Sequence, residues 1–294
     1  MQYGMSTTNI FLDYDADELN RQYDQRAWAA NAETVINRYG VDSNAVRVRL
    51  GEPQVMAYGA SPAETVDIYR SREPDAPIHV FFHGGAWRAL SRRESAFAAE
   101  TFVSAGAHFI AVGFALLPDV TLAEMVGQAR RAVAEIHRRA GEFGGDRDRL
   151  YVSGHSSGAH LAACVLTTDW RAFGFPDEII KGGLCVSGLY DLLPVRLSAR
   201  NSYVRLDQDG ERALSPLRSL QHLGCPVVVA MAEHDSDEFR RQARDFSAAI
   251  SARSMSVRLV DGRGFNHFEI IETLSRRDGM LGKIALEQMG LDRR

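Results

Sequence analysis

The fold is decided by residues 150–163, which read LYVSGHSSGAHLAA. A strand-forming apolar run, 150–152, leads into Gly154-His155-Ser156-Ser157-Gly158, and a helix-forming run follows directly. A G-x-S-x-G pattern between strand and helix is typical of a strained turn that exposes a serine nucleophile. Glycine permits the tight turn, and the helix that begins there offers free N–H groups to negative charge. A simple glycine-rich turn does not account for the apolar strand before it, so we predict that Ser156 is a nucleophile.

The rest of the chain alternates short β-rich runs with longer amphipathic ones. Further strands are predicted at 66–69, 78–82, 109–112, 184–186, 227–231 and 257–260. Helices are predicted at about 92–105, 122–140, 157–168, 238–253 and 279–289. Near-continuous apolar strands separated by helices indicate an α/β fold, in which a mostly parallel sheet is covered by helices on both faces.

The chain has no internal repeat and no linker that would separate domains, so we expect a single domain over residues 1–294. Apolar and aromatic side chains at helical intervals predict one or two helices within 12–40, ending near Gly40. Residues 1–50 are therefore expected to form an N-terminal helical segment, and this segment is a candidate partial cap.

Composition excludes several classes of protein. The net charge is −4, from 34 basic and 38 acidic residues, so no basic field for nucleic acid or an anionic membrane is expected. No signal peptide and no membrane-spanning apolar run is recognised. Three cysteines in apolar surroundings predict reduced thiols and a cytoplasmic protein, and neither their spacing nor that of the histidines implies a metal or another cofactor. The sequence does not reveal the oligomeric state, and a homodimer is left open.

A second motif, His83-Gly84-Gly85-Ala86-Trp87, closes the strand predicted at 78–82. Acyl transfer requires stabilisation of an oxyanion, and adjacent glycines let backbone N–H groups approach it closely. We assign this role to the N–H groups of Gly84 and Gly85, together with that of Ser157. The alternative reading is a plain turn, which does not account for its coincidence with the serine motif some 70 residues later.

The base and the acid come from the last third of the chain. In this class of fold the order along the chain is nucleophile, acid, base. His267 follows the strand predicted at 257–260, and we predict that it is the general base. Asp235 follows the strand at 227–231 and is the first choice for the acid, with Glu233 and Asp237 as competitors.

Together these residues resemble the kynurenine formamidase (arylformamidase) family, a branch of the α/β-hydrolases. The resemblance extends from about residue 20 to the C-terminus. It rests on His83-Gly84-Gly85-x-Trp87, residues 154–163, Asp169-Trp170, Val186-Ser187-Gly188-x-x-Asp191-Leu192, Ser215-Pro216, Asp235-Ser236-x-Glu238-Phe239-x-Arg241-Gln242 and residues 266–272.

The resemblance implies an eight-stranded α/β-hydrolase fold with the N-terminal helices over the active-site mouth. It assigns the acid to Asp235 and implies hydrolysis of N-formyl-L-kynurenine to kynurenine and formate. Two residues depart from the family pattern, because Ala86 stands where a larger aromatic residue is common and Phe114 where a tyrosine is common. A wider or less polar pocket on the oxyanion side is therefore expected.

The predicted activity is that of a serine hydrolase acting on a small aromatic amide or ester. A carboxylesterase for short-chain or aryl esters is the alternative enzyme, and a non-catalytic ligand-binding homologue is the alternative from another class. Tyr23 and Trp28 are predicted to form aromatic walls of the pocket, or else to fasten the N-terminal helices to the domain. Trp87 and, by resemblance, Asn201 complete the predicted substrate-binding residues.

Overall fold

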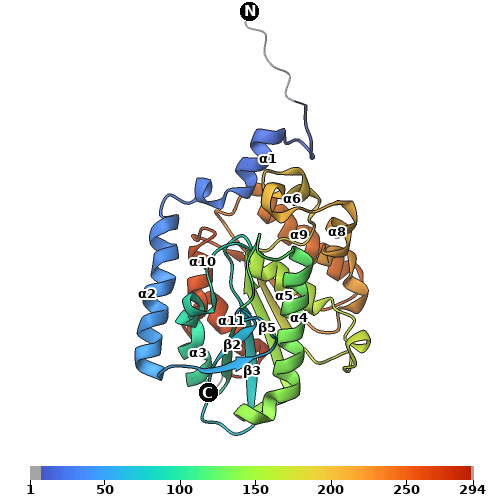
Figure 1. Ribbon diagram of the computed structural model, residues 1–294. Coiled ribbons are helices and arrows are strands. Elements are labelled where there is room, and N and C mark those ends of the chain that lie inside the picture. Colours follow the sequence, from blue (N-terminus) through green and yellow to red (C-terminus); the bar gives the residue numbers. More distant parts are fainter. Residues whose placement is uncertain (1–7, 293–294) are drawn as a thin grey trace, which may run out of the picture.

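The computed structural model describes residues 8–292 and is built around one central sheet (Figure 1). The strands lie in the order β1-β2-β4-β3-β5-β6-β7-β8. Their bounds are β1 Gln54–Ala57, β2 Thr65–Tyr69, β3 Ala76–Phe82, β4 His108–Val112, β5 Gly145–His155, β6 Gly182–Val186, β7 Val227–Ala232 and β8 Val257–Gly262. The pairings β1–β2 and β2–β4 are antiparallel and the other five are parallel. The mostly parallel sheet expected from the sequence is confirmed.

The buried strands were predictable because their side chains are apolar on both faces. All residues of β3, β4, β6 and β7 are buried, which is the pattern of a parallel sheet covered on both sides. β1 escaped the residue-based prediction because only Met56 of its four residues is buried. The family resemblance implies eight strands, and this number includes β1.

Helices cover both faces of the sheet (Figure 1). One apolar cluster packs α4 (Leu122–Arg139), α5 (Ser157–Leu166) and α9 (Asp237–Ala252) against the sheet. A second cluster packs α2 (Ala32–Leu50), α3 (Ala99–Ser104) and α11 (Met280–Gln288) on the opposite face. The remaining helices are short: α1 (Ala16–Tyr23), α6 (Leu193–Leu197), α7 (Asn201–Val204), α8 (Gln208–Ala213), α10 (Glu269–Glu272) and the 3-10 turns η1 (Gln25–Trp28), η2 (Arg92–Ala98), η3 (Ala140–Phe143), η4 (Arg171–Phe173), η5 (Pro216–Arg218), η6 (Leu220–His222) and η7 (Thr273–Ser275).

The predicted helix end near Gly40 is wrong, because α2 continues to Leu50. A glycine inside a helix costs only about 1 kcal/mol, which packing can offset. Here Tyr39 is buried and stacks on Phe97 at a centroid distance of 5.4 Å, and Val46 is buried on the same side of the sheet. The helix stops instead at Gly51, whose φ of 88° marks the cap.

The N-terminal segment is fastened to the far end of the chain by buried polar contacts. The Tyr23 hydroxyl donates to Glu238 Oε1 at 3.2 Å, and Gln25 Nε2 donates to Ser236 Oγ at 2.8 Å. The Glu238 backbone N–H in turn donates to Gln22 Oε1 at 3.0 Å. These contacts hold α1 and η1 against the start of α9, at the upper end of the sheet in Figure 1.

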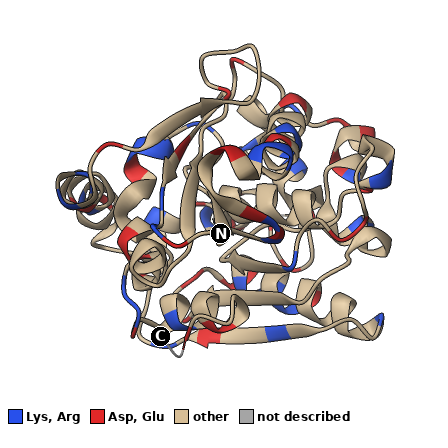
Figure 2. Ribbon diagram, turned by 90° about the horizontal axis from the view of Figure 1, so that it is seen from below, with Lys and Arg blue, Asp and Glu red and all other residues tan. Residues whose placement is uncertain are grey.

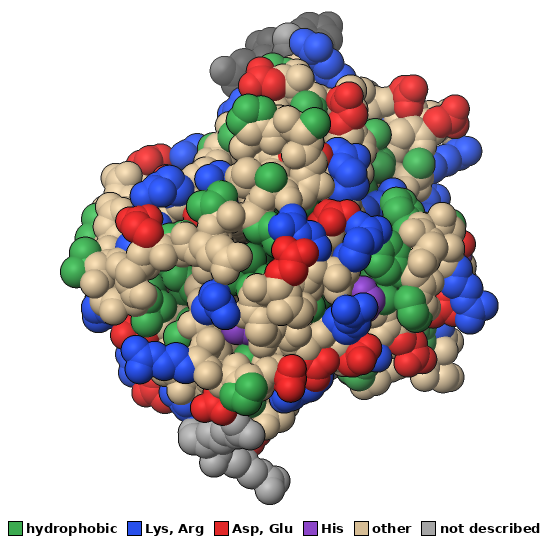
Figure 3. Space-filling view, turned by 60° about the horizontal axis from the view of Figure 1, so that its bottom comes forward, with side chains coloured by type: hydrophobic (Ala, Val, Ile, Leu, Met, Phe, Trp, Pro, Cys, Tyr) green, Lys and Arg blue, Asp and Glu red, His purple; other side chains and the backbone are tan. Residues whose placement is uncertain are grey.

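Charged side chains of both signs are interspersed over the molecule. Figure 2 shows Lys and Arg alternating with Asp and Glu along the helices and loops, and Figure 3 shows the same mixture with small apolar patches between. No helix within residues 8–292 combines the length and the apolar character that a membrane crossing needs.

Candidate active site

Ser156 sits in a strained turn between β5 and α5. Its φ of 55° and ψ of −123° belong to a region that costs a non-glycine residue about 1–3 kcal/mol. Close packing forces the turn on the chain. A Cβ on Gly154 would lie 2.1 Å from the Gly158 carbonyl oxygen, and one on Gly158 would lie 2.1 Å from the Phe82 carbonyl oxygen. Both glycines of the G-x-S-x-G pattern are therefore required by close backbone contact.

Ser156, His267 and Asp235 form one hydrogen-bonded chain. His267 Nε2 lies 3.0 Å from Ser156 Oγ, and His267 Nδ1 lies 2.6 Å from Asp235 Oδ1. The serine follows β5, the aspartate follows β7 and the histidine follows β8, so three parallel strands deliver them to the same edge of the sheet. All three side chains are buried, which strengthens the polar contacts among them.

Asp235 is the carboxylate that contacts the histidine, and its two competitors lie elsewhere. Its Oδ2 accepts hydrogen bonds from Ser187 Oγ at 2.6 Å and from the Ala232 backbone N–H at 2.8 Å. Glu233 instead accepts the Gly264 N–H at 2.7 Å, and Asp237 is an exposed first-turn residue of α9.

Ser187 is a site residue that we did not predict from the sequence. It follows β6, has a φ of 48° and is fully buried. Its backbone N–H donates to the Ala230 carbonyl at 2.7 Å, which holds it at the end of the β6–β7 pair. The signal that could have found it is the Val186-Ser187-Gly188 motif, which carries part of the family resemblance.

The loop after β3 lies against the serine turn. A Cβ on Gly84 would be 3.3 Å from Ser156 Cβ, so the Gly84 backbone lies close to the serine and a larger residue would crowd it. His83 Nδ1 donates to the Gly84 carbonyl at 2.8 Å and fixes that peptide. The φ of Gly85 is 110°, and a Cβ there would lie 2.0 Å from the Ala89 carbonyl oxygen.

Ser157 ties this loop to the start of α5, because its Oγ accepts the Trp87 backbone N–H at 3.1 Å. Within residues 8–292, the backbone N–H groups of Gly84, Gly85 and Ser157 have no hydrogen-bond acceptor. Three unused donors thus belong to residues that border Ser156. This is the arrangement that an oxyanion site requires.

His155 fixes the position of the His267 backbone. Its Nε2 donates to the His267 carbonyl at 2.7 Å, which requires the neutral tautomer with the proton on Nε2. Burial, reinforced by the neighbouring His267, lowers the pKa of His155 to about 3. The ring therefore stays neutral at physiological pH and serves as a support for His267.

Four buried histidines should make the fold acid-labile. Burial lowers the pKa of His79 and His155 to about 3 and that of His83 and His160 to about 4, whereas the unfolded value is about 6.5. The unfolded chain therefore binds more protons below pH 6.5. The free energy of unfolding should fall as the pH drops from 6.5 toward 4, by up to about 5 kcal/mol per pH unit for four groups.

Urea unfolding at pH 7, 6 and 5 measures this slope. His79→Gln removes one titrating group while keeping a polar partner for Ser153 Oγ, which lies 2.6 Å from His79 Nε2. We expect this variant to reduce the slope by about 1.4 kcal/mol per pH unit. An unfolding free energy that does not change between pH 7 and pH 5 contradicts the prediction.

A cavity of about 150 Å³ opens beside Ser156 and His267. This volume suits one aromatic ring, since an engineered cavity of similar size binds benzene. The N-terminal segment forms part of its wall. The lining residues are Asp24, Gln25, Arg26, Ile36, Tyr39, Gly85, Ala86, Arg88, Ala89, Leu90, His155, Ser156, Arg200, His267 and Phe268.

None of the four predicted substrate-binding residues is among those lining residues. Tyr23 and Trp87 are buried behind the wall, and the Trp87 Nε1 donates to His160 Nδ1 at 3.3 Å. The Trp28 indole donates to the Arg21 carbonyl at 3.1 Å, and Asn201 caps its own loop through the Leu206 N–H at 2.7 Å.

The predicted residues Tyr23 and Trp28 make contacts within the N-terminal region and with α9. Tyr39, Phe268 and three arginines, which the sequence did not single out, line the cavity.

The two departures from the family pattern have different surroundings. Ala86 lines the cavity with a φ of 53°, so its small side chain leaves room there. Phe114 is buried and stacks on His83 at a centroid distance of 4.3 Å. It therefore supports the loop that carries Gly84 rather than the cavity itself.

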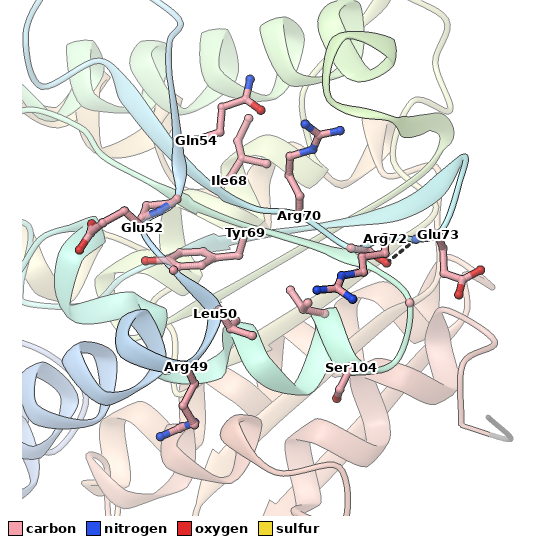
Figure 4. Close-up of a pocket in the computed structure, with 15 residues that line it drawn as sticks. Arg49, Leu50, Glu52, Gln54, Ile68, Tyr69, Arg70, Arg72, Glu73 and Ser104 are labelled. Carbon is pink, nitrogen blue, oxygen red and sulfur yellow. Dashed lines mark hydrogen bonds between the residues drawn. The ribbon is translucent and has the colours of Figure 1, made fainter.

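A larger hollow of about 650 Å³ lies between the end of α2, β1, β2 and α3, and it is lined by none of the predicted site residues (Figure 4). Figure 4 shows Arg49, Arg70 and Arg72 directed to different sides, so their charges do not converge on one ligand. Arg49 is also paired with Glu100 at 2.7 Å. Within residues 8–292, no group of three His, Cys, Asp or Glu side chains is arranged to hold a metal ion.

The eight-stranded sheet and the strained serine beside a buried histidine define the class of α/β-hydrolases. The BD-FAE family model matches residues 66–174. Kynurenine formamidase of Danio rerio is 36% identical over 93% of this chain and 96% of its own length, and that of Salmo salar is 35% identical over 95% and 98%. The chain belongs to the kynurenine formamidase family.

Solved structures show the same fold at lower identity. A putative thioesterase from Silicibacter sp. superposes with a TM-score of 0.79 at 24% identity, covering 91% of this chain and 98% of that one. An esterase from Pyrobaculum calidifontis superposes with a TM-score of 0.69 at 19% identity, covering 92% and 97%. These likenesses support the α/β-hydrolase architecture expected from the sequence.

Proposed function

We propose that this protein is a serine hydrolase that cleaves an aryl formamide of the N-formylkynurenine type. The observation that carries the proposal is the chain of short hydrogen bonds from Ser156 through His267 to Asp235, beside a cavity that suits one aromatic ring. Membership of the kynurenine formamidase family supports the choice of a formamide. The chemistry that such a site can perform is acyl transfer through a serine ester.

In the first half of the reaction His267 takes the proton of Ser156, and the serine oxygen attacks the formyl carbon. Negative charge then develops on the carbonyl oxygen, where the N–H groups of Gly84, Gly85 and Ser157 can donate to it. Each such donor is worth about 3–4 kcal/mol of transition-state stabilisation in serine hydrolases. The C–N bond breaks as His267 returns the proton to the aryl amine, which leaves a formyl ester on Ser156.

In the second half water attacks the formyl ester with His267 again as base. The bond between Ser156 Oγ and the formyl carbon breaks as His267 returns the proton to Ser156, and formate leaves. Asp235 holds the imidazole with Nδ1 protonated, so that Nε2 is free to accept the serine proton. An aryl amine is a better leaving group than an alkyl amine because its lone pair is delocalised into the ring. The same groups can therefore cleave anilides and activated esters.

A steady-state comparison of N-formyl-L-kynurenine with p-nitrophenyl acetate tests the proposal. We expect kcat/KM for the formamide to exceed that for the ester by about 100-fold or more, a difference of about 3 kcal/mol in transition-state binding. Good ester turnover with negligible formamide turnover would instead make the protein a carboxylesterase. If the protein neither turns over these substrates nor is labelled by a fluorophosphonate, it is a non-catalytic binding protein.

A cytoplasmic location is part of the same proposal. It is supported by three buried cysteines, Cys164, Cys185 and Cys225, that form no disulfide in the structure. The same proposal leaves a homodimer open.

A further inference from the structure

The walls of the cavity beside Ser156 carry more positive than negative charge. The charged lining residues are three arginines and one aspartate: Arg26, Arg88, Arg200 and Asp24. Arg26 is exposed and already paired, with its Nε 2.7 Å from Glu33 Oε1. Arg88 is also exposed, and its guanidinium lies over the ring of Tyr203 at 4.5 Å. The third arginine, Arg200, is partly buried and differs from both.

Arg200 has no carboxylate partner within residues 8–292. Its Nη2 donates to the Tyr23 backbone carbonyl. Its Nη1 is shielded from solvent and has no acceptor in this part of the chain. Buried charged groups are nearly always paired and hydrogen-bonded, so an unpaired guanidinium at a cavity wall suggests that its partner is a ligand.

The surroundings of Arg200 hold its guanidinium in place. The guanidinium carbon lies 5.3 Å from the centre of the Tyr23 ring and 6.0 Å from that of the Trp87 ring. The Arg200 backbone N–H donates to Ser198 Oγ at 3.2 Å. Aromatic faces favour a cation without using its N–H groups. The charge is therefore positioned in advance, while donors remain for another partner.

We propose that Arg200 binds a carboxylate on the leaving-group side of the substrate, so that the preferred substrates are aryl amides or aryl esters whose leaving group carries a carboxylate. A guanidinium offers parallel N–H donors that match the two oxygens of a carboxylate. Arg200 is one of the residues that line the cavity, so a ligand bound there would lie against its side chain. This inference rests on the proposed function of Ser156, because it concerns the same cavity.

A purely structural role for Arg200 is the competing explanation. In that case the residue would serve to join the segment before α7 to the end of α1, through the Tyr23 carbonyl. This role uses Nη2 and the two aromatic contacts, and it leaves Nη1 without an acceptor. The two explanations differ in a measurable way, because only a recognition role distinguishes charged from uncharged substrates.

The test compares Arg200→Gln with the unmodified protein on a matched pair of formamides. N-formyl-L-kynurenine carries a carboxylate and an ammonium group, and 2-formamidoacetophenone is an aryl formamide with the same ring substitution and neither charge. We expect the variant to lose about 30- to 100-fold in kcat/KM on the first, mainly through KM, and no more than about threefold on the second. Arg200→Lys should recover part of the loss, because it restores the charge without the paired donors.

Arg212→Gln serves as the matched control, since it removes an exposed arginine of α8 and changes the net charge equally. We expect it to behave like the unmodified protein on both substrates. Equal losses on both substrates for Arg200→Gln, with a lower melting temperature, would overturn the proposal in favour of the structural role. Unchanged kinetics on both substrates would overturn it as well.

A second substrate pair separates this inference from the proposed function. Phenyl acetate and 3-acetoxybenzoate differ by a carboxylate on the leaving group, and neither is a formamide. If the unmodified protein hydrolyses esters alone, the formamidase proposal fails, while a selective loss on 3-acetoxybenzoate in Arg200→Gln still supports carboxylate recognition. A protein that hydrolyses none of the four substrates overturns both proposals.

Discussion

Ser156→Ala is expected to lower kcat on N-formyl-L-kynurenine by on the order of 10⁴- to 10⁶-fold. The substitution removes the oxygen that forms the acyl-enzyme and leaves only the binding and oxyanion contributions. Ser156 Oγ hydrogen-bonds with His267, and the strained backbone is unchanged by the substitution, so the melting temperature should change little. Steady-state rates and intact-mass detection of a fluorophosphonate adduct measure the two consequences.

Ser157→Ala is the matched control, because it removes the neighbouring serine of the same motif. Ser157 Oγ accepts the Trp87 N–H and so positions the loop that carries Gly84 and Gly85. We expect a loss of about tenfold in kcat with the adduct still formed, since the backbone N–H of residue 157 is retained. If this variant loses the adduct while Ser156→Ala keeps it, the assignment of the nucleophile is wrong.

Asp235→Asn is expected to lower kcat by about 10⁴-fold with little effect on KM. Asp235 accepts hydrogen bonds from His267 Nδ1, from Ser187 Oγ and from the Ala232 N–H. An asparagine presents its NH₂ group to one side, and Ser187 and Ala232 already supply donors to Oδ2. The NH₂ group is thus directed at His267 and favours the tautomer with the proton on Nε2, which cannot accept the serine proton.

Comparison with the two nearby carboxylates makes this prediction specific. Glu233→Gln and Asp237→Asn change the same charge, yet neither side chain contacts His267. We expect both to retain kcat within about threefold. Ser187→Ala should lower kcat by an intermediate amount, about ten- to a hundredfold. It removes one of the donors that orient Asp235. An Asp235→Asn enzyme with more than a tenth of the original kcat contradicts the assignment.

The part of the fold that the sequence predicted is the part with strong local patterns. Strands such as β3 and β7 are apolar along their whole length, and the serine motif lies between an apolar strand and a helix. The extent of α2 could not be predicted from its own residues. Its passage through Gly40 depends on the burial of Tyr39 and Val46 against residues far along the chain.

The same contrast between local sequence patterns and distant contacts applies to the residues of the candidate site. Ser156 and His267 stand in recognisable positions after predicted strands, whereas residue patterns alone left Asp235 in competition with its neighbours. Ser187 was missed because its contact with Asp235 depends on the register between β6 and β7. Arg200 was missed because its partner, the carbonyl of Tyr23, lies 177 residues away in the chain.

The contacts between the N-terminal segment and α9 also determine the order in which parts of the structure form during translation. Tyr23 leaves the ribosome 215 residues before its partner Glu238. At about 5–20 residues per second, some 10–40 s pass before the two can meet. During that interval the sheet can assemble, but the cavity wall formed by the N-terminal segment cannot. The substrate cavity is therefore among the last features to form, and a nascent chain released before α9 would carry Ser156 without an enclosed site.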